Sequence, residues 1–515
     1  GSENDIKNST ESTIVAGTEN LLSGSKDSSV LGGLENIIEN SKRSSIGGGT
    51  GNYISGDSSF IGAGAQNEVF KDQSAILAGR DNIVSGTHSI IGGGFFNSGL
   101  GENGSILGGR NNLIGGNTDS ASILGGRNNE VKNGDQAALL GGRENKISGS
   151  FSSLVGGSGN SLFGEGTVLL GGENNELSGQ FSALLGGQNN NITGTASAIV
   201  VGRNQDIKNS DDSSINAGTD NEINNSTGIA IVAGGGNLVS GSSDSSINAG
   251  TGNEITSSTS SAVIAGAKNK ITGSKYSSIN VGTGNDITNS TGIAIIAGIS
   301  NSLSGSKNSL IGAGTGHNLN TSTESSIAAG RLNSITGSSD SFVSAGTGNS
   351  VTGSSSSFIG AGTSNSLSGS KNSSVLGGQE NDIRSSTGSS ISAGSGNYMS
   401  GNSSFIGAGK ENKVYEDDSS LLGGQGNIVS GKKSVIGGGL YNEVLGEKGS
   451  ILGGRGNLIG EETEAASLLG GRGNEVRSGD QSSLVGGRDN KISGSFNSLV
   501  GGSGNFLFGD GIVLL

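Results

Sequence analysis

The sequence predicts an all-β solenoid, a stack of about 33 short coils of 15–17 residues each. Three observations predict this fold class. An Asn recurs once per coil, a Gly stands three residues before it, and aliphatic side chains occupy two fixed positions around it. Gly- and Ser-rich sequence without a period is typical of linkers, whereas a strict short period is typical of stacked repeats.

The recurring Asn, called the anchor below, sets the register of the coils. From Asn4 to Asn505 there are 33 anchors, of which 31 are Asn, one is Gln205 and one is His317. Asn tolerates the left-handed backbone conformation, and its amide bonds readily to neighbouring groups. We therefore expect each anchor either to adopt that conformation or to bond its neighbours, with identical side chains forming a ladder along the stack.

The aliphatic positions predict two short strands per coil. Every anchor from Asn20 onward has Ile, Val or Leu six residues before it, and 32 of the 33 anchors have an aliphatic residue or Met two residues after it, with Gly99 as the exception. Each piece is bounded by small polar residues, a pattern typical of a strand with one inward side chain. With about 15.7 residues per coil, the two strands predict a flattened roll.

Glycine and proline usage fits such a stack. Of 515 residues 101 are Gly and none is Pro. The Gly before each anchor ends the first strand, where we expect a positive φ or a close approach of two backbones. Proline is absent because every strand must donate hydrogen bonds to its neighbour.

Composition excludes several function classes. The chain has no Cys and two His, His88 and His317, which leaves little material for metal clusters or catalytic triads. We expect no enzyme, no metal and no cofactor. A net charge of −14 without a basic run disfavours nucleic acid as a partner. No apolar run approaches the roughly 20 residues that cross a bilayer, so we expect no direct membrane insertion.

Two long blocks of the chain are copies of each other. Residues 28–170 and 373–515 align without a gap at a constant offset of 345. The central coils, residues 171–372, hold a 16-residue spacing from Gln205 onward and repeat there as 32-residue double coils. We expect residues 1–515 to form one continuous roll, since solenoid repeats contact only their neighbours and can be copied in blocks.

Arginines in one register are the candidate ligand-binding residues. Two residues before the anchor, Arg falls on three consecutive coils in each block. These residues are Arg110, Arg127, Arg143, Arg455, Arg472 and Arg488. Like charges about 5 Å apart repel. They therefore need nearby acids, a carboxylate of another subunit, or an anionic ligand such as a sulfated glycan or an acidic protein.

A second aliphatic column lies five residues before the anchor, next to the inward one. Its members in the first half of the chain include Leu31, Leu77, Leu107, Leu124, Leu140, Val155, Leu170 and Leu185. A roll with one inward residue per strand has a thin core. We expect this column to contact other copies of the chain, the alternative being a solvated outer face.

Two further features have a plain and a functional interpretation. His317 at an anchor position is either a tolerated substitution or the centre of a pH-sensitive coil. The acidic runs at residues 461–464 and at Asp417 and Asp418 could attract calcium, but they lack the regular spacing of calcium-binding loops and favour solvated turns.

The repeated pattern resembles the head of trimeric autotransporter adhesins. The pattern S-x-I-x-G-G-x-x-N-x-I-x-G, as in SILGGRNNLIGG (105–116) and SSLVGGSGNSLFG (152–164), is similar to their YadA-type left-handed parallel β-roll over essentially all 515 residues. The resemblance implies a left-handed roll and a side-by-side homotrimer. It also implies an extracellular head at the bacterial outer membrane that binds host matrix proteins, host-cell receptors or other bacteria, as in virulence and biofilm formation.

The sequence departs from the family in places. Each of its coils has more residues than a coil in the smaller heads of the family. No neck-like motif, heptad stalk or membrane anchor is found, so we interpret the chain as a head fragment. Other function classes are an ice- or crystal-surface-binding solenoid, which favours a regular Thr column not seen here, and a phage fibre shaft. A polysaccharide-processing solenoid would need clustered carboxylates in a groove.

Overall fold

A computed structural model describes all residues, 1–515, and consists of strands and turns without a helix. The chain is a parallel β-solenoid of about 32 turns, divided into two units. The first unit, Gly1–Ser257, holds β1 (Asp5–Lys7) to β33 (Glu254–Thr256). The second, Ser258–Leu515, holds β34 (Ala262–Val263) to β66 (Val513–Leu514).

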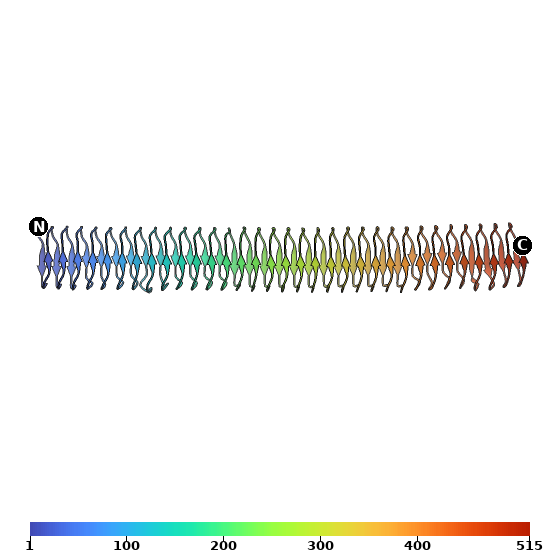
Figure 1. The fold of residues 1–515 in the computed structure, drawn as a ribbon, viewed down its shortest axis with the longest axis horizontal. Coiled ribbons are helices and arrows are strands. Elements are labelled where there is room, and N and C mark those ends of the chain that lie inside the picture. The colour runs from blue at the N-terminus through green and yellow to red at the C-terminus, as the bar shows by residue number, and fades with distance from the viewer. The chain divides into compact units, whose positions relative to one another are not determined.

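Every coil contributes one even-numbered and one odd-numbered strand. Each even-numbered strand is the pair of residues ending six before the anchor, as in β4 (Ser29–Val30). Each odd-numbered strand begins directly after the anchor, as in β5 (Ile37–Glu39), and has two or three residues except β59 (Leu458–Glu462) and β61 (Glu475–Ser478). Within each unit the strands stack side by side with turns along both edges (Figure 1). The prediction of two short strands per coil is confirmed.

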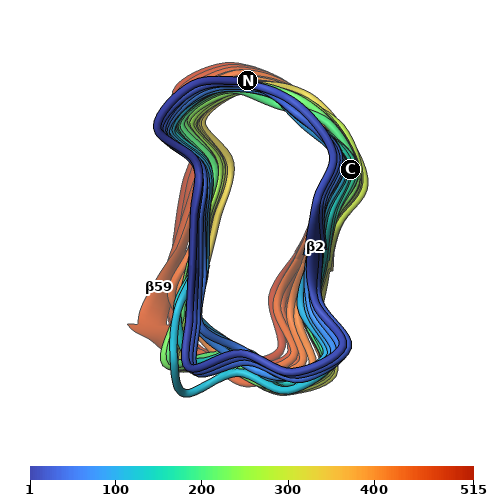
Figure 2. The same cartoon turned by 90° about the vertical axis from the view of Figure 1, so that its left-hand side faces the viewer.

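Seen end-on, each coil is a closed outline with two long sides (Figure 2). In the second unit β59 stands out from its neighbours (Figure 2), because it lies in a 17-residue coil and its pairing with β61 shifts register. The extra residues of this coil are thus taken up outside the stack.

All strand pairs are parallel and join equivalent residues of successive coils. In the first unit Ser29 pairs with Ser45 and Val30 with Ile46. Single-residue bridges add pairing outside the strands. They occur two residues before the anchor and, in most 16-residue coils, six residues after it. Each coil therefore pairs with its neighbour at up to four places, two more than the two predicted strands provide.

The two inward aliphatic columns form the core, as predicted. Val30 and Leu22 represent the two columns, and both side chains are fully buried. Fully burying a side chain of this size contributes about 1.5–3 kcal/mol. The core is one residue thick on each side, and its stability accumulates coil by coil.

The anchor side chains form a buried hydrogen-bond ladder. The Asn36 amide nitrogen Nδ2 donates to Asn20 Oδ1 at 3.0 Å, to the Gly32 carbonyl at 3.1 Å and to the Gly49 carbonyl at 3.0 Å. The Asn36 backbone N–H also donates to Asn20 Oδ1. The ladder is confirmed, whereas the left-handed conformation falls one residue earlier, as at Glu35 with φ 58°.

The Gly three residues before the anchor has both properties predicted for it. In 31 of 32 coils its φ lies between 89° and 141°, the exception being Gly202 in the coil where Gln205 replaces Asn. A Cβ on Gly33 would overlap the Gly49 carbonyl oxygen and the Asn36 amide. Only Gly fits this position, because any side chain would collide with the next coil.

Buried serines form ladders at the opposite end of the coil, which the sequence pattern did not reveal. The Ser28 hydroxyl donates to the Ser41 carbonyl and accepts from the Ser44 N–H at 3.2 Å. In 16-residue coils a second ladder runs beside it, where the Ser25 hydroxyl accepts from the Ser41 N–H at 3.2 Å. The serines satisfy backbone groups that the turns leave unpaired inside the stack.

Candidate functional site

The six candidate arginines form two ladders, one in each unit. The first arginine ladder is Arg110, Arg127 and Arg143, and the second is Arg455, Arg472 and Arg488. Within each ladder, successive arginines pair directly as parallel bridges. The Arg127 N–H donates to the Gly142 carbonyl and its carbonyl accepts from the Glu144 N–H, both at 2.9 Å. The backbone therefore places the Cα atoms of the arginines in one row with a repeat of about 4.8 Å.

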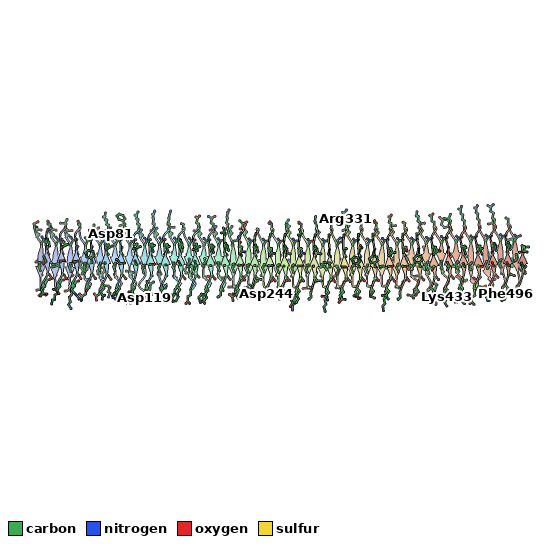
Figure 3. The ribbon with its side chains drawn as sticks, in the orientation of Figure 1. Asp81, Asp119, Asp244, Arg331, Lys433 and Phe496 are labelled. Atoms are coloured by element: carbon green, nitrogen blue, oxygen red, sulfur yellow. The ribbon has the colours of Figure 1, made fainter.

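The arginine register lies at an edge of the unit that carries it. Figure 3 shows Arg331, which occupies this register in the second unit, extending from one edge, while Lys433 and Phe496 lie at the opposite edge. All six ladder arginines are exposed. The row therefore faces solvent and is open to a ligand.

Acidic neighbours pair with only one arginine in each ladder. Arg143 Nε lies 3.0 Å from Glu144 Oε1, and Arg488 Nε lies 3.5 Å from Asp489 Oδ2. Arg110 makes no ion pair within the chain, and neither do Arg127, Arg455 and Arg472. Exposed pairs of this kind contribute little to stability. Local pairing therefore leaves most of the ladder charge uncompensated.

The two blocks keep the arginines while the residues beside them differ. Asn111 follows Arg110 in the first block, and Gly456 follows Arg455 in the second. Asn128 and Gly473 differ in the same way after the middle arginine. The arginines are therefore the shared feature of the two edges, independent of the turn residue that follows.

The second aliphatic column is exposed and forms a lateral stripe. The eight members named above are 40–58% exposed. From Leu107 to Leu185 the stripe runs over six successive coils without a polar interruption. In the second unit it continues at Leu452, Leu469, Val485 and Val500. Contiguous exposed apolar surface is uncommon on a monomeric protein and marks an interaction face.

A column of small residues runs beside the lateral stripe, one position closer to the anchor. It is Gly or Ala in 30 of 32 coils, and the exceptions, Val201 and Val281, are each 53% exposed. A Cβ on Gly125 would have no atom of the chain within 4 Å. The coil itself therefore does not require a small residue here. In the sequence this column is visible as a position occupied by Gly or Ala. Only the structure shows that the coil itself has room for a larger side chain there.

His317 occupies its anchor position as a buried imidazole. Its Nδ1 accepts the Asn333 N–H at 3.1 Å, which places the ring proton on Nε2, and Nε2 has no hydrogen-bond partner. Burial lowers the pKa of His317 below its usual value, an effect that its contacts with the backbone of Ala313, Asn333 and Gly330 oppose. Protonation would bury a charge and break the bond from Asn333.

We expect this coil to weaken in acid. Because the folded-state pKa of His317 lies below its unfolded value near 6.5, its contribution to stability is present above that value and is lost as the pH falls through the folded pKa. Hydrogen exchange of the Asn333 amide should be faster in the parent than in His317→Asn, by a larger factor at pH 5 than at pH 8. An equal ratio at both pH values would exclude the pH-sensitive coil.

The acidic runs have structural partners. Asp417 Oδ1 accepts the Asn402 N–H at 2.7 Å, so this carboxylate caps the turn of the preceding coil. Glu464 pairs with Lys448. No group of three or more His, Cys, Asp or Glu is placed to hold a metal ion. Two shallow depressions of about 290 and 250 Å³ are lined by residues near Val500 and near Lys448.

Comparisons with known proteins add little to this description. No family model matches the chain, and no curated protein matches it. Among solved structures, a proposed acetyltransferase from Desulfovibrio desulfuricans G20 shares 9% identity over 48% of this chain and 63% of that one, with a TM-score of 0.11. A likeness at this level carries no argument about fold or function. No helix of the chain has the length and apolar character needed to cross a membrane.

Proposed function

We propose that the chain is part of a non-enzymatic bacterial surface adhesin, an extracellular head in which three copies of a left-handed roll pack side by side. The observation that carries the proposal is the lateral stripe with its neighbouring column of small residues. A thin two-column core and an uninterrupted apolar stripe favour association, and the small residues allow another backbone to approach closely.

Association explains features that a single chain leaves without a reason. Leu124 is 45% exposed in the isolated chain, and Gly125 beside it has space for a side chain. In a side-by-side assembly the Leu side chains of one copy would lie over the small residues of the next. The repeated rigid coils then supply a long, regular surface on which host matrix proteins, receptors or other bacteria can bind at several points.

Enlarging the small column should break the assembly without unfolding the coils. We expect the triple variant Gly108→Val, Gly125→Val and Gly156→Val to fold, because a Cβ at each of these glycines meets no atom within 4 Å and Val201 and Val281 occupy the same position. Its mass in solution should fall from three chains to one, measured by light scattering. The matched control is Ser158→Val, Gln188→Val and Thr219→Val, two residues before the anchor, a register that Ile299 occupies elsewhere in the chain. An unchanged mass in the triple variant would remove the lateral stripe from the interface.

Adhesion itself is tested by a binding screen. The purified chain is presented to immobilised host matrix proteins, receptor ectodomains and whole bacteria, with heat-unfolded chain as the control. The proposal expects saturable binding of the folded chain to at least one of these. Retention no greater than that of the unfolded control on every surface would contradict an adhesin role.

A further inference from the structure

We propose that the two arginine ladders bind sulfated polysaccharide, so that each chain presents two separate sites for an anionic glycan. The proposal names one class of receptor within the adhesin function and rests on that function for its biological setting. The physical basis of the glycan proposal does not depend on the adhesin function, because it consists of the rows of arginine and the aromatic residues beside them.

The ladders carry charge that the chain itself does not neutralise. Four of the six guanidinium groups have no acidic partner, and the residues that follow them differ between the blocks. Three like charges in one row repel, and an anionic polymer laid along the row removes that repulsion. A guanidinium also donates two parallel hydrogen bonds to one oxyanion, which a lysine does not. The chain keeps arginine at all six positions.

An exposed aromatic ring flanks each ladder. Phe96 lies on the coil before Arg110 and is 50% exposed, and Tyr441 lies on the coil before Arg455 and is 55% exposed. Phe95, next to Phe96, forms the bridge to Arg110 directly. The flat apolar face of an exposed ring suits the face of a sugar ring. A row of cations beside an exposed aromatic ring therefore suits an anionic sugar chain.

The spacing of the row favours a sulfated glycan over a nucleic acid. The arginine positions repeat at about 4.8 Å, and three of them match a polymer with an anionic group on nearly every sugar. Phosphates of a duplex strand advance by about 3.4 Å along the helix axis and wind around that axis, so they do not form a straight row that the three arginines could follow. Beyond the ladder, the net charge of −14 would also repel the phosphates of a long nucleic acid.

The proposal is tested with heparin as the probe, on the full chain. The variant replaces all six ladder arginines with Gln, the residue that occupies this register at Gln188, Gln379 and Gln425. The charge-matched control replaces six other basic residues with Gln: Lys26, Lys42, Arg203, Arg331, Lys432 and Lys433. Binding is measured over a range of salt concentrations, with hyaluronan and single-stranded DNA as the comparison ligands. A second variant carries Phe96→Ser and Tyr441→Ser.

We expect the ladder variant to lose at least about 10-fold in heparin affinity and to show a shallower salt dependence, while the control keeps both. The aromatic variant should lose affinity with an unchanged salt slope. Equal losses in ladder variant and control, or parent binding no tighter to heparin than to DNA or hyaluronan, would overturn the proposal. A ladder variant that falls to a lower mass in solution would assign the arginines to the subunit interface and overturn it also.

Failure of this proposal leaves adhesion standing. The same ladder variant, tested in the screen against matrix proteins, receptors and bacteria, separates the two. Retained attachment with lost heparin binding shows a receptor other than sulfated glycan, whereas absent attachment by the parent chain counts against the adhesin function.

Discussion

Replacing the buried anchor Asn112 with Asp is expected to destabilise its coil by about 3–4 kcal/mol. Asn112 Nδ2 donates to the carbonyls of Gly108 at 2.9 Å and Gly126 at 3.2 Å. A carboxylate of the same shape cannot donate, and it would bring negative charge against both carbonyl oxygens in a position that is 1% exposed. The Asn129 N–H would still find its acceptor, so the penalty isolates the lost donors and the buried charge.

The measurement is hydrogen exchange, because a long repeat protein can open one region at a time. Amides of the coils around residue 112 should exchange roughly 100- to 1,000-fold faster in the variant, while coils far along the same unit change little. Asn111→Asp, one residue earlier on an exposed turn, is the matched control and should exchange as the parent does. Equal behaviour of the two variants would mean that the ladder does not hold the coils together.

The second large effect is expected at Gly126, three residues before its anchor. Gly126 has φ 93°, and a Cβ there would overlap both the Asn129 amide and the Gly142 carbonyl oxygen. Gly126→Ala should therefore cost about 3 kcal/mol or more, since left-handed strain of about 1 kcal/mol adds to a clash that forces two coils apart. The adjacent Gly125 has no atom within 4 Å of its virtual Cβ.

Comparison of Gly126→Ala with Gly125→Ala separates two roles of glycine, the close contact with the next coil at Gly126 and the open space at Gly125. Limited proteolysis should cut the Gly126 variant near the altered coil and leave the Gly125 variant as resistant as the parent. If both variants resist equally, the coil tolerates a side chain at the inner position and the packing described here is wrong.

Repetition made the interior of the fold predictable. The aliphatic columns and the anchor column are so regular that their burial follows from the sequence, and the structure places Val30, Leu22 and Asn36 where the pattern predicts. The left-handed position before the anchor was not foreseen because its residue type varies, as in Glu35, Gly51 and Phe96. There the backbone conformation is imposed by the stack and not by local propensity.

The buried serines were missed for a related reason. Ser is common in turns, and nothing in its own chemistry distinguishes Ser28, which is 2% exposed, from a solvated turn residue. Its role appears only when the coil length is considered. The extra residue of a 16-residue coil brings a second serine, such as Ser25, into line with the Ser41 N–H of the next coil.

The sequence predicted which arginines align in a row, but it did not predict that the row is exposed to solvent. Parallel coils place Arg110, Arg127 and Arg143 in one row, as expected from their common distance to the anchor. Exposure of that row, and the lack of acidic partners for most of it, depends on where the turns direct neighbouring side chains. The open space beside Gly125 likewise depends on the folded structure and does not follow from the sequence.

The mass of the purified chain in solution tests the central claim most directly, because in the proposed assembly the side-by-side packing of three copies would complete the thin core and cover the lateral stripe. Light scattering is predicted to give three times the 50.5 kDa of one chain, with no change on dilution through the micromolar range. A mass of one chain, with the stripe left in water, would contradict the account.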